Sequence, residues 1–404
     1  MQAIAESSDL EFDSLLRVAP PTLYLKALQA RYLLKEGFPI RPLPPESYKE
    51  VMKENEPSTL ERLRKHFEEL YPRDSVTPEE FYEDYAKELL EEVARAREGA
   101  IIADPFTTNL ILRMSSQVQR ALEEKYSRKL NDVVVGILPT GRINAMTIHV
   151  PSGGDVVAVN EGSVIFLHLI CRILSSFVVA GTHEGGMLFQ LSPAELPVAI
   201  SKNKEAAKDF CQVLSVYKSD DETSLARNLP ESLRAPSMAG LNTSQQLLTG
   251  FLANAAYHFI IAHEYFHFIA EGPPPGYRRR MLANVQEVDE TVHSKEEEIS
   301  ADKRALELVL DYYTKVGEGV DIAIWYSGVE LLLCIIEIVE ESMQGRLDTD
   351  SYPKATERRE YLRQWLRQRY GDRAQSAILA GDYFEDLILR LRERCKSEKL
   401  FLMA

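Results

Sequence analysis

Cysteine is scarce in this sequence, and its spacing gives no sign of a metal site built on thiolates. Only four cysteines occur among 404 residues, at Cys171, Cys211, Cys334 and Cys395. None belongs to a C-x-x-C pair, the spacing that many zinc sites and thioredoxin-like redox sites use. The wide spacing predicts reduced and mostly buried thiols, which are usual in an intracellular protein.

Positive charge is also in deficit. The chain has 47 lysines and arginines against 62 aspartates and glutamates, and its formal net charge is −15. Proteins that bind nucleic acid in general neutralise phosphates with basic side chains. We therefore expect no nucleic-acid partner, and the negative charge favours solubility.

Signals for export and for a membrane are weak or missing. The first nine residues have neither the basic segment nor the apolar segment of a secretory signal, so we expect a cytoplasmic protein. One nearly continuous apolar segment runs from Val164 to Ala180. It is short for a membrane span, and it contains His168 and Arg172, which are costly in lipid. We therefore predict a buried core helix there and no membrane partner.

What the sequence does contain is an H-E-x-x-H motif, His263-Glu264-Tyr265-Phe266-His267, inside an apolar segment that suits a helix. Two histidines four residues apart lie on one helix face, so both can bind one Zn²⁺ at about 2.0–2.1 Å. Glu264 would then stand where a base can take a proton from the activated water. The alternative is that both are ordinary core histidines, whose ring nitrogens have hydrogen-bond partners inside the protein and bind no metal.

A second motif supplies a candidate third ligand. The segment from Lys295 to Ala305 contains E-x-x-A-D, from Glu298 to Asp302. It resembles the third-ligand helix of the gluzincin metallopeptidases. That resemblance implies that Glu298 completes a His₂Glu zinc site, that Ala301 lets two helices approach, and that Asp302 orients a ligand histidine.

The glutamates before this motif also suit a plain helix start. Glu296, Glu297 and Glu298 would favour the first turn through the helix dipole, with Ser294 as the N-cap. Both interpretations can hold together. Among the three glutamates only Glu298 has the A-D pair at the right offset, and Glu297 is the second choice.

A third segment, from Asp350 to Arg359, looks like the S-H-P-x-x-x-E-R segment of the CAAX-prenyl-protease type of gluzincin. Tyr352 stands where those proteins carry histidine. The resemblance implies that Tyr352 or Arg358 reaches the site as a catalytic residue, with the Tyr352 hydroxyl donating to the oxyanion. An ordinary helix start at Pro353 is the alternative.

The soluble Lit-type peptidases, which cut a host translation factor during phage exclusion, are a further resemblance. It is based on H-E-x-x-H and on the strand-then-glycine segment from Val156 to Gly162. This resemblance does not indicate a substrate for the chain.

The predicted fold class is α+β, mainly α. We expect a helical N-terminal region over 1–130, a zincin-like metallopeptidase domain over 131–370 and a C-terminal helical extension over 371–404. Short strands at 132–138, 143–150 and 156–160, joined by tight turns, predict an antiparallel meander. The gluzincin resemblance implies a small antiparallel sheet above the active-site helix, with an edge strand free to pair with an extended peptide.

Helices are predicted from Thr77 through Val93 and from Pro105 to about Lys125. The basic run at 278–280 is expected in a loop that reaches about His293, either simply solvated or acting as a lid. His293 itself is expected on the surface, with a position near the site as the alternative. The last stretch, 361–400, is expected to form surface or partner-facing helices.

Together these features predict a zinc-dependent endopeptidase acting on a protein or peptide. Zn²⁺ would be held by His263, His267 and Glu298, with Glu264 as the general base. One alternative is a regulatory or toxin-like protease with a single protein target, in phage defence or stress, selected through the N-terminal helices, which could also bind a regulatory partner. Another is a zinc-stabilised binding module without turnover, which the presence of Glu264 disfavours.

Overall fold

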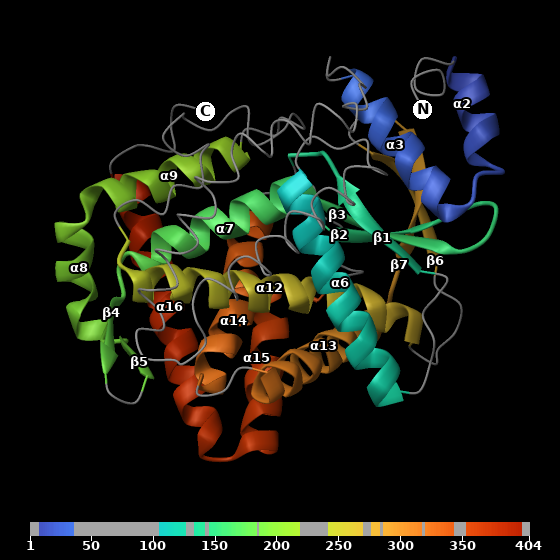
Figure 1. Ribbon diagram of the computed structural model, residues 1–404. Helices are drawn as coiled ribbons and strands as arrows, with labels where there is room; N and C mark the ends of the chain where they lie inside the picture. Colours follow the sequence, from blue (N-terminus) through green and yellow to red (C-terminus); the bar gives the residue numbers. More distant parts are fainter. Residues whose placement is uncertain are drawn as a thin grey trace, which may run out of the picture.

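The computed structural model describes most of the chain from residue 105 onward, together with a short N-terminal segment. Helices account for most of these residues, and a small sheet lies at one end of the helical body (Figure 1). The helix predicted from Thr77 lies outside the described residues. The described ranges are 8–35, 105–126, 133–141, 145–183, 186–218, 241–269, 276–282, 286–316, 320–342 and 353–397.

The main sheet has five strands in the order β1-β3-β2-β7-β6. It is mixed: β1 (Val133–Leu138) pairs in parallel with β3 (Asp155–Asn160), and β3 pairs antiparallel with β2 (Ala145–His149). The predicted antiparallel meander, and with it an antiparallel sheet, is therefore wrong, although the three strands were placed correctly. Val156 to Asn160 are all buried, which suits a strand with neighbours on both of its edges.

The other two strands form a hairpin in a segment predicted to be a loop. β6 (Gly276–Leu282) pairs antiparallel with β7 (Gln286–Val292), and β7 joins the sheet through β2. β7 is rich in charged residues, so its sequence lacks the apolar alternation that marks a strand. Because of this hairpin the basic run at 278–280 lies on an edge strand.

Two N-terminal helices cover one face of the sheet. α2 (Asp9–Leu16) and α3 (Pro21–Lys35) share a small core with β1, β2, β3 and β7. A Cβ atom at Gly136 would lie only 2.3 Å from the Leu25 side chain, so glycine lets α3 approach β1 closely. The Gln29 side-chain amide of α3 donates to the Ile137 carbonyl at 2.6 Å.

The other side of the sheet meets the helical body, in which α12 (Thr243–Ile269) crosses the centre (Figure 1). Its neighbours include α6 (Pro105–Tyr126), α7 (Glu161–Ser175), α13 (Lys295–Val316) and α14 (Ile322–Ser342). A Cβ atom at Gly328 of α14 would lie 2.4 Å from the Leu252 carbonyl oxygen, so these two helices touch through glycine.

The prediction for α6 is confirmed, and the buried helix predicted over 164–180 is confirmed as far as Ser175; it is wrong at its end, where Val179 and Ala180 belong to a strand. α6 begins at Pro105, and Phe166, Leu167 and Ile170 of α7 are fully buried. Within the described residues, the segment Ile322–Glu340 of α14 is long and apolar enough to cross a membrane, and 83% of its most apolar window is buried inside the protein.

The remaining helices complete the body. α15 (Ala355–Tyr370) and α16 (Arg373–Ser397) pack on α14, and a buried Glu330 of α14 bonds Arg363 at 2.6 Å and Tyr326. α16 buries Phe384, Leu387 and Leu391, so the C-terminal stretch is part of the core as well as of the surface.

A second sheet pairs β4 (Val179–His183) with β5 (Gly186–Gln190), followed by η1 (Pro193–Glu195), α8 (Leu196–Lys202) and α9 (Lys204–Lys218).

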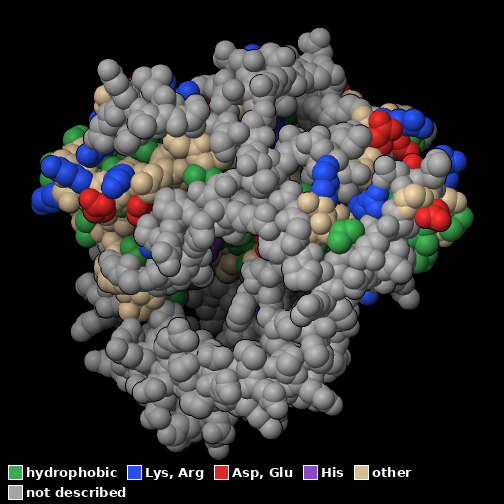
Figure 2. Space-filling model, turned by 90° about the horizontal axis from the view of Figure 1, so that it is seen from above, with side chains coloured by type: hydrophobic (Ala, Val, Ile, Leu, Met, Phe, Trp, Pro, Cys, Tyr) green, Lys and Arg blue, Asp and Glu red, His purple; other side chains and the backbone are tan. Residues whose placement is uncertain are grey.

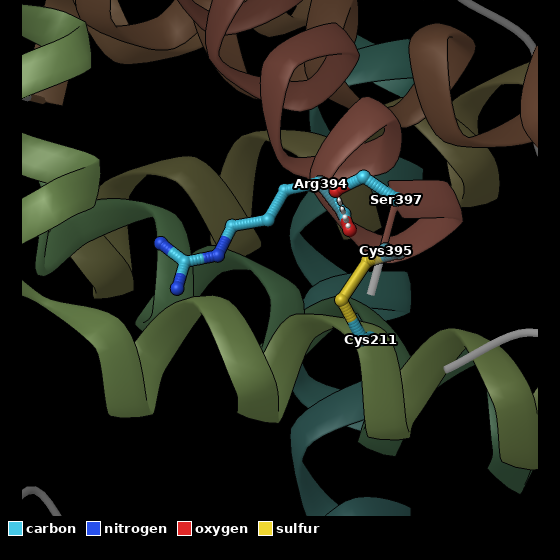
Figure 3. The surroundings of a disulfide bond; sticks show 4 residues. All are labelled: Cys211, Arg394, Cys395 and Ser397. Carbon is cyan, nitrogen blue, oxygen red and sulfur yellow. Dashed lines mark hydrogen bonds between the residues drawn. A yellow bond between two sulfur atoms is a disulfide. The ribbon is translucent and has the colours of Figure 1, made fainter. Parts of the chain in front are cut away.

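Two of the four cysteines form a disulfide, which corrects the prediction of reduced thiols. Cys211 of α9 bonds Cys395 of α16, with their Cα atoms 5.5 Å apart (Figure 3). Beside it the Ser397 hydroxyl donates to the Arg394 carbonyl at 2.9 Å. Cys171 and Cys334 are free and buried, as expected.

Candidate metal-binding and catalytic site

The two helices that carry the motifs bring three candidate ligands together. On α12, Nε2 of His263 and Nε2 of His267 lie 3.1 Å apart. From α13, the Glu298 carboxylate reaches both, with Oε2 3.2 Å from His263 Nε2 and Oε1 3.6 Å from His267 Nε2. All three side chains are largely buried, and their ligand atoms lie within 4.8 Å of one another. This group could hold a metal ion.

The donor set and its spacing fit a tetrahedral ion. With bonds of about 2.0–2.1 Å, two corners of a tetrahedron lie roughly 3.3–3.4 Å apart. The 3.1 Å between the two Nε2 atoms and the 3.2 Å from His263 Nε2 to Glu298 Oε2 lie close to that value, and His267 Nε2 is 3.6 Å from the other carboxylate oxygen, Oε1. Two imidazoles and one carboxylate also leave one corner open, as sites with a chemical rather than a purely structural role do.

The helix start that carries Glu298 is set by local sequence. Ser294 and Glu297 form a reciprocal cap: the Ser294 N–H donates to Glu297 Oε2 at 2.7 Å, and the Glu297 N–H donates to Ser294 Oγ at 3.2 Å. Glu297 is therefore used in capping, and Glu298 is the glutamate that faces the histidines. Ala301 is buried at 3% exposure, where α13 packs against α12.

Asp302 lies behind His263. Its Oδ1 is 2.9 Å from His263 Nδ1, although off the line of the ring N–H bond. Such a contact favours the proton on Nδ1 and leaves the Nε2 lone pair facing the other ligands. Burial opposes the charge of Asp302, but Arg358 and His263 outweigh it and lower its pKa to about 2.

Arg358, from α15, holds Asp302 with two parallel hydrogen bonds. Nε donates to Oδ2 at 2.6 Å and NH2 donates to Oδ1 at 2.6 Å. This two-pronged geometry is the strongest form of an arginine–carboxylate pair. Sequence reasoning placed Arg358 among the catalytic residues; the structure places it against Asp302. Tyr352, the other candidate from that segment, lies outside the described residues.

The charges around the ligand group favour a cation. Burial opposes the charged form of His263, but Asp302 and Glu298 overcome it and raise the His263 pKa to about 10. Burial, together with the neighbouring His263, lowers the His267 pKa to about 2. Glu298 stays ionised, because the histidines and Arg358 lower its pKa to about 2 against the effect of burial. The group thus favours positive charge between the two ring nitrogens.

Glu264 follows His263 on α12 and is buried at 9% exposure. The Thr147 hydroxyl of β2 donates to Glu264 Oε2 at 3.0 Å. Burial raises the Glu264 pKa to about 6, while His263 and the Thr147 hydrogen bond act in the opposite direction. A carboxylate with a pKa near neutrality can both take and return a proton. Sequence reasoning did not single out Thr147, because nothing local marks a strand threonine that faces a helix 117 residues away.

His293 was expected on the surface, with a position near the site as the alternative; the surface position is wrong and the alternative holds. It is only 9% exposed, and its ring stacks on the ring of His267 with centroids 3.6 Å apart and planes 10° apart. It therefore lies directly beside the candidate ligands. Seen from above, one histidine side chain, which the view does not label, is visible near the centre of the molecule (Figure 2).

Comparison with known proteins gives one match. Residues 187–372, a little under half of the chain, match the family Peptidase U49, which is the Lit-type peptidase family. The matched span contains the H-E-x-x-H motif, Glu298, Asp302 and Arg358, and it begins after the strand-then-glycine segment at 156–162. The match supports a peptidase, a hydrolase acting on peptides. No curated protein and no solved structure matches the chain.

Replacing Asp302 by asparagine should weaken metal binding without removing a ligand. Asparagine keeps the shape but loses the charge that favours the Nδ1 proton of His263. Loss of such a supporting group typically costs about 10-fold to 100-fold in metal affinity or activity. Competition with a chelator measures the affinity, and Asp382→Asn, a change of an exposed aspartate on α16, is the control. Equal zinc affinity in the Asp302 variant and the wild type would contradict the supporting role.

Proposed function

We propose that the protein is a zinc-dependent endopeptidase. The observation that carries this proposal is the grouping of His263, His267 and Glu298 with a glutamate, Glu264, next to the first histidine and buried beside them. Two neutral nitrogen ligands and one carboxylate suit zinc better than magnesium or calcium, which prefer oxygen ligands. The Peptidase U49 match supports peptide hydrolysis as the reaction.

A zinc ion held by these residues would polarise the scissile carbonyl and lower the pKa of a bound water to about 7. Glu264 accepts the proton of the attacking water and returns it to the leaving amine. Thr147 fixes one oxygen of Glu264, so the other carboxylate oxygen can face the water. Asp302, held by Arg358, keeps the His263 ring in the orientation that points Nε2 toward the other ligands.

A zinc-stabilised binding module needs no base, so the environment of Glu264 argues against it. A structural site would be closed by a fourth protein ligand. Among the described residues the close group contains three ligands. Glu264 is buried next to the first histidine and accepts a hydrogen bond from Thr147, a position that a purely structural site does not require.

The proposal is tested by a cleavage assay that assumes no substrate. Purified protein is incubated with a library of peptides derived from whole-cell protein, and new peptide ends are found by mass spectrometry. We expect new ends with zinc-loaded protein, none after a chelator strips the metal, and recovery when zinc is returned. Equal cleavage before and after complete metal removal would refute the zinc mechanism.

Replacing Thr147 by valine should shift the pH dependence of that activity. The Thr147 hydrogen bond stabilises the ionised form of Glu264 and lowers its pKa. Without the bond the pKa rises, so the base becomes ionised only at higher pH. The acidic limb of kcat/KM against pH should therefore move upward. An unchanged limb would show that Thr147 does not govern the base.

Thr249→Val is the matched control for this measurement. Thr249 is fully buried on α12, and its hydroxyl donates to the Gln245 carbonyl of the same helix, away from Glu264. The control should leave the acidic limb in place even if it changes stability. A similar shift in both variants would point to a general loss of packing instead of a change at Glu264.

A further inference from the structure

His293 is held at the site by the backbone on both sides. It directly follows β7, which pairs with β6 up to Val292, and it directly precedes Ser294, the N-cap of α13. The strand and the capped helix therefore fix the position of its Cα atom. A ring placed so firmly against a candidate ligand is expected to contribute to the site.

The orientation of the ring excludes a role as a further ligand. A metal ion lies in the plane of each imidazole that binds it, at about 2.0–2.1 Å from the nitrogen. The rings of His293 and His267 are nearly parallel, 10° apart, with centroids separated by 3.6 Å. An ion in the plane of the His267 ring therefore lies well out of the plane of the His293 ring. His293 therefore lies in the layer next to the ligands and outside the ligand group itself.

The hydrogen bonding of His293 is incomplete. Among the described residues, its buried Nε2 has no hydrogen-bond partner, and its Nδ1 is 4.0 Å from Glu297 Oε2, beyond hydrogen-bond range. His258, on α12, has a partner at each ring nitrogen: Nδ1 is 2.6 Å from the Tyr313 hydroxyl and Nε2 is 3.0 Å from the Gln117 side-chain amide. A buried polar atom without a partner is costly, and it calls for a ligand that completes it.

We propose that Nε2 of His293 donates a hydrogen bond to the scissile carbonyl oxygen of the peptide substrate. This proposal rests on the proposed function, because it assumes that a peptide carbonyl enters beside His263, His267 and Glu298. As water adds to the carbonyl carbon, its oxygen gains negative charge, and a fixed N–H donor stabilises that charge. His293 is thus a catalytic residue that contacts the substrate. It does so on the face of the His267 ring against which its own ring stacks.

The test compares three replacements of His293. Phenylalanine keeps a flat ring for the stack on His267 but has no N–H; glutamine restores an N–H donor; alanine removes both. Each zinc-loaded variant is titrated with acetohydroxamate, whose oxygens accept hydrogen bonds, and its zinc affinity is measured separately by chelator competition. His149→Phe is the control, because His149 bonds Asp155 and its ring contacts Tyr277 at a tilt, with centroids 4.8 Å apart, outside the ligand group.

We expect His293→Phe to bind zinc as the wild type does and acetohydroxamate roughly 10-fold to 100-fold more weakly, the usual loss for one hydrogen bond to a charged acceptor. His293→Gln should recover part of that loss, and His149→Phe should show none. For a cleaved peptide, kcat should fall in His293→Phe by a larger factor than KM rises.

Two results would overturn the proposal. One is acetohydroxamate affinity in His293→Phe equal to that of the wild type. The other is loss of zinc from both His293→Phe and His293→Gln, which would make His293 a support for His267 instead of a donor to the substrate. A wild-type protein that binds no zinc would instead refute the proposed function, so the two failures are distinguishable.

Discussion

Protein in which His263 and His267 are both alanine should purify without zinc, whereas the wild type should carry one zinc ion per chain. The two ring nitrogens lie 3.1 Å apart and Glu298 reaches both. Removing both imidazoles leaves one carboxylate, too few donors to retain the ion through purification. Metal analysis by mass spectrometry gives the stoichiometry.

The control for this experiment is His258→Ala together with His149→Ala, which removes two histidines outside the ligand group. That variant should keep its zinc if it folds. Circular dichroism shows whether each variant has kept its helices. Stoichiometric zinc in the folded His263 and His267 variant would mean that the ion binds elsewhere, and the proposed site would have to be abandoned.

The second large effect is expected from Glu264→Gln. Glutamine is nearly the same size and can still accept the Thr147 hydrogen bond through its amide oxygen, so the fold and the metal content should be kept. It cannot take a proton. Loss of a general base costs about 10²–10⁴ in rate, and here the same group also returns the proton to the leaving amine. Turnover is measured on a peptide that the wild type cleaves.

Glu290→Gln is the matched control for this variant. Glu290 is buried on β7 and is near enough to raise the Glu264 pKa, yet it belongs to the sheet and not to the motif. It should retain most of the turnover. Equal turnover in Glu264→Gln and the wild type, with zinc bound in both, would remove Glu264 from the mechanism.

The part of the candidate site that could be predicted from the sequence consists of residues that lie close together along the chain. His263 and His267 are four apart on one helix, so their shared face follows from the helix period alone. Glu298 and Asp302 have the same spacing on α13, and the two motifs meet because each marks the face of its own helix that packs on the other. The mainly helical class and the small sheet were also readable from local pattern.

The features that sequence reasoning missed depend on contacts between distant segments. β3 inserts between β1 and β2, a choice of partner that no local pattern determines. Thr147 reaches Glu264 across 117 residues, and His293 becomes a site residue only because the unexpected hairpin carries it to His267. The Cys211–Cys395 bond spans 184 residues, too far for the spacing of the cysteines to indicate it.

That bond also determines what a cut in this chain would release. Cys211 and Cys395 close a covalent ring that contains α12, α13, α14 and α15, and so every candidate zinc ligand. One cleavage anywhere between the two cysteines, by the protein itself or by another protease, opens the ring but frees no fragment. The nicked chain keeps its full mass under non-reducing conditions and separates into two pieces only after reduction.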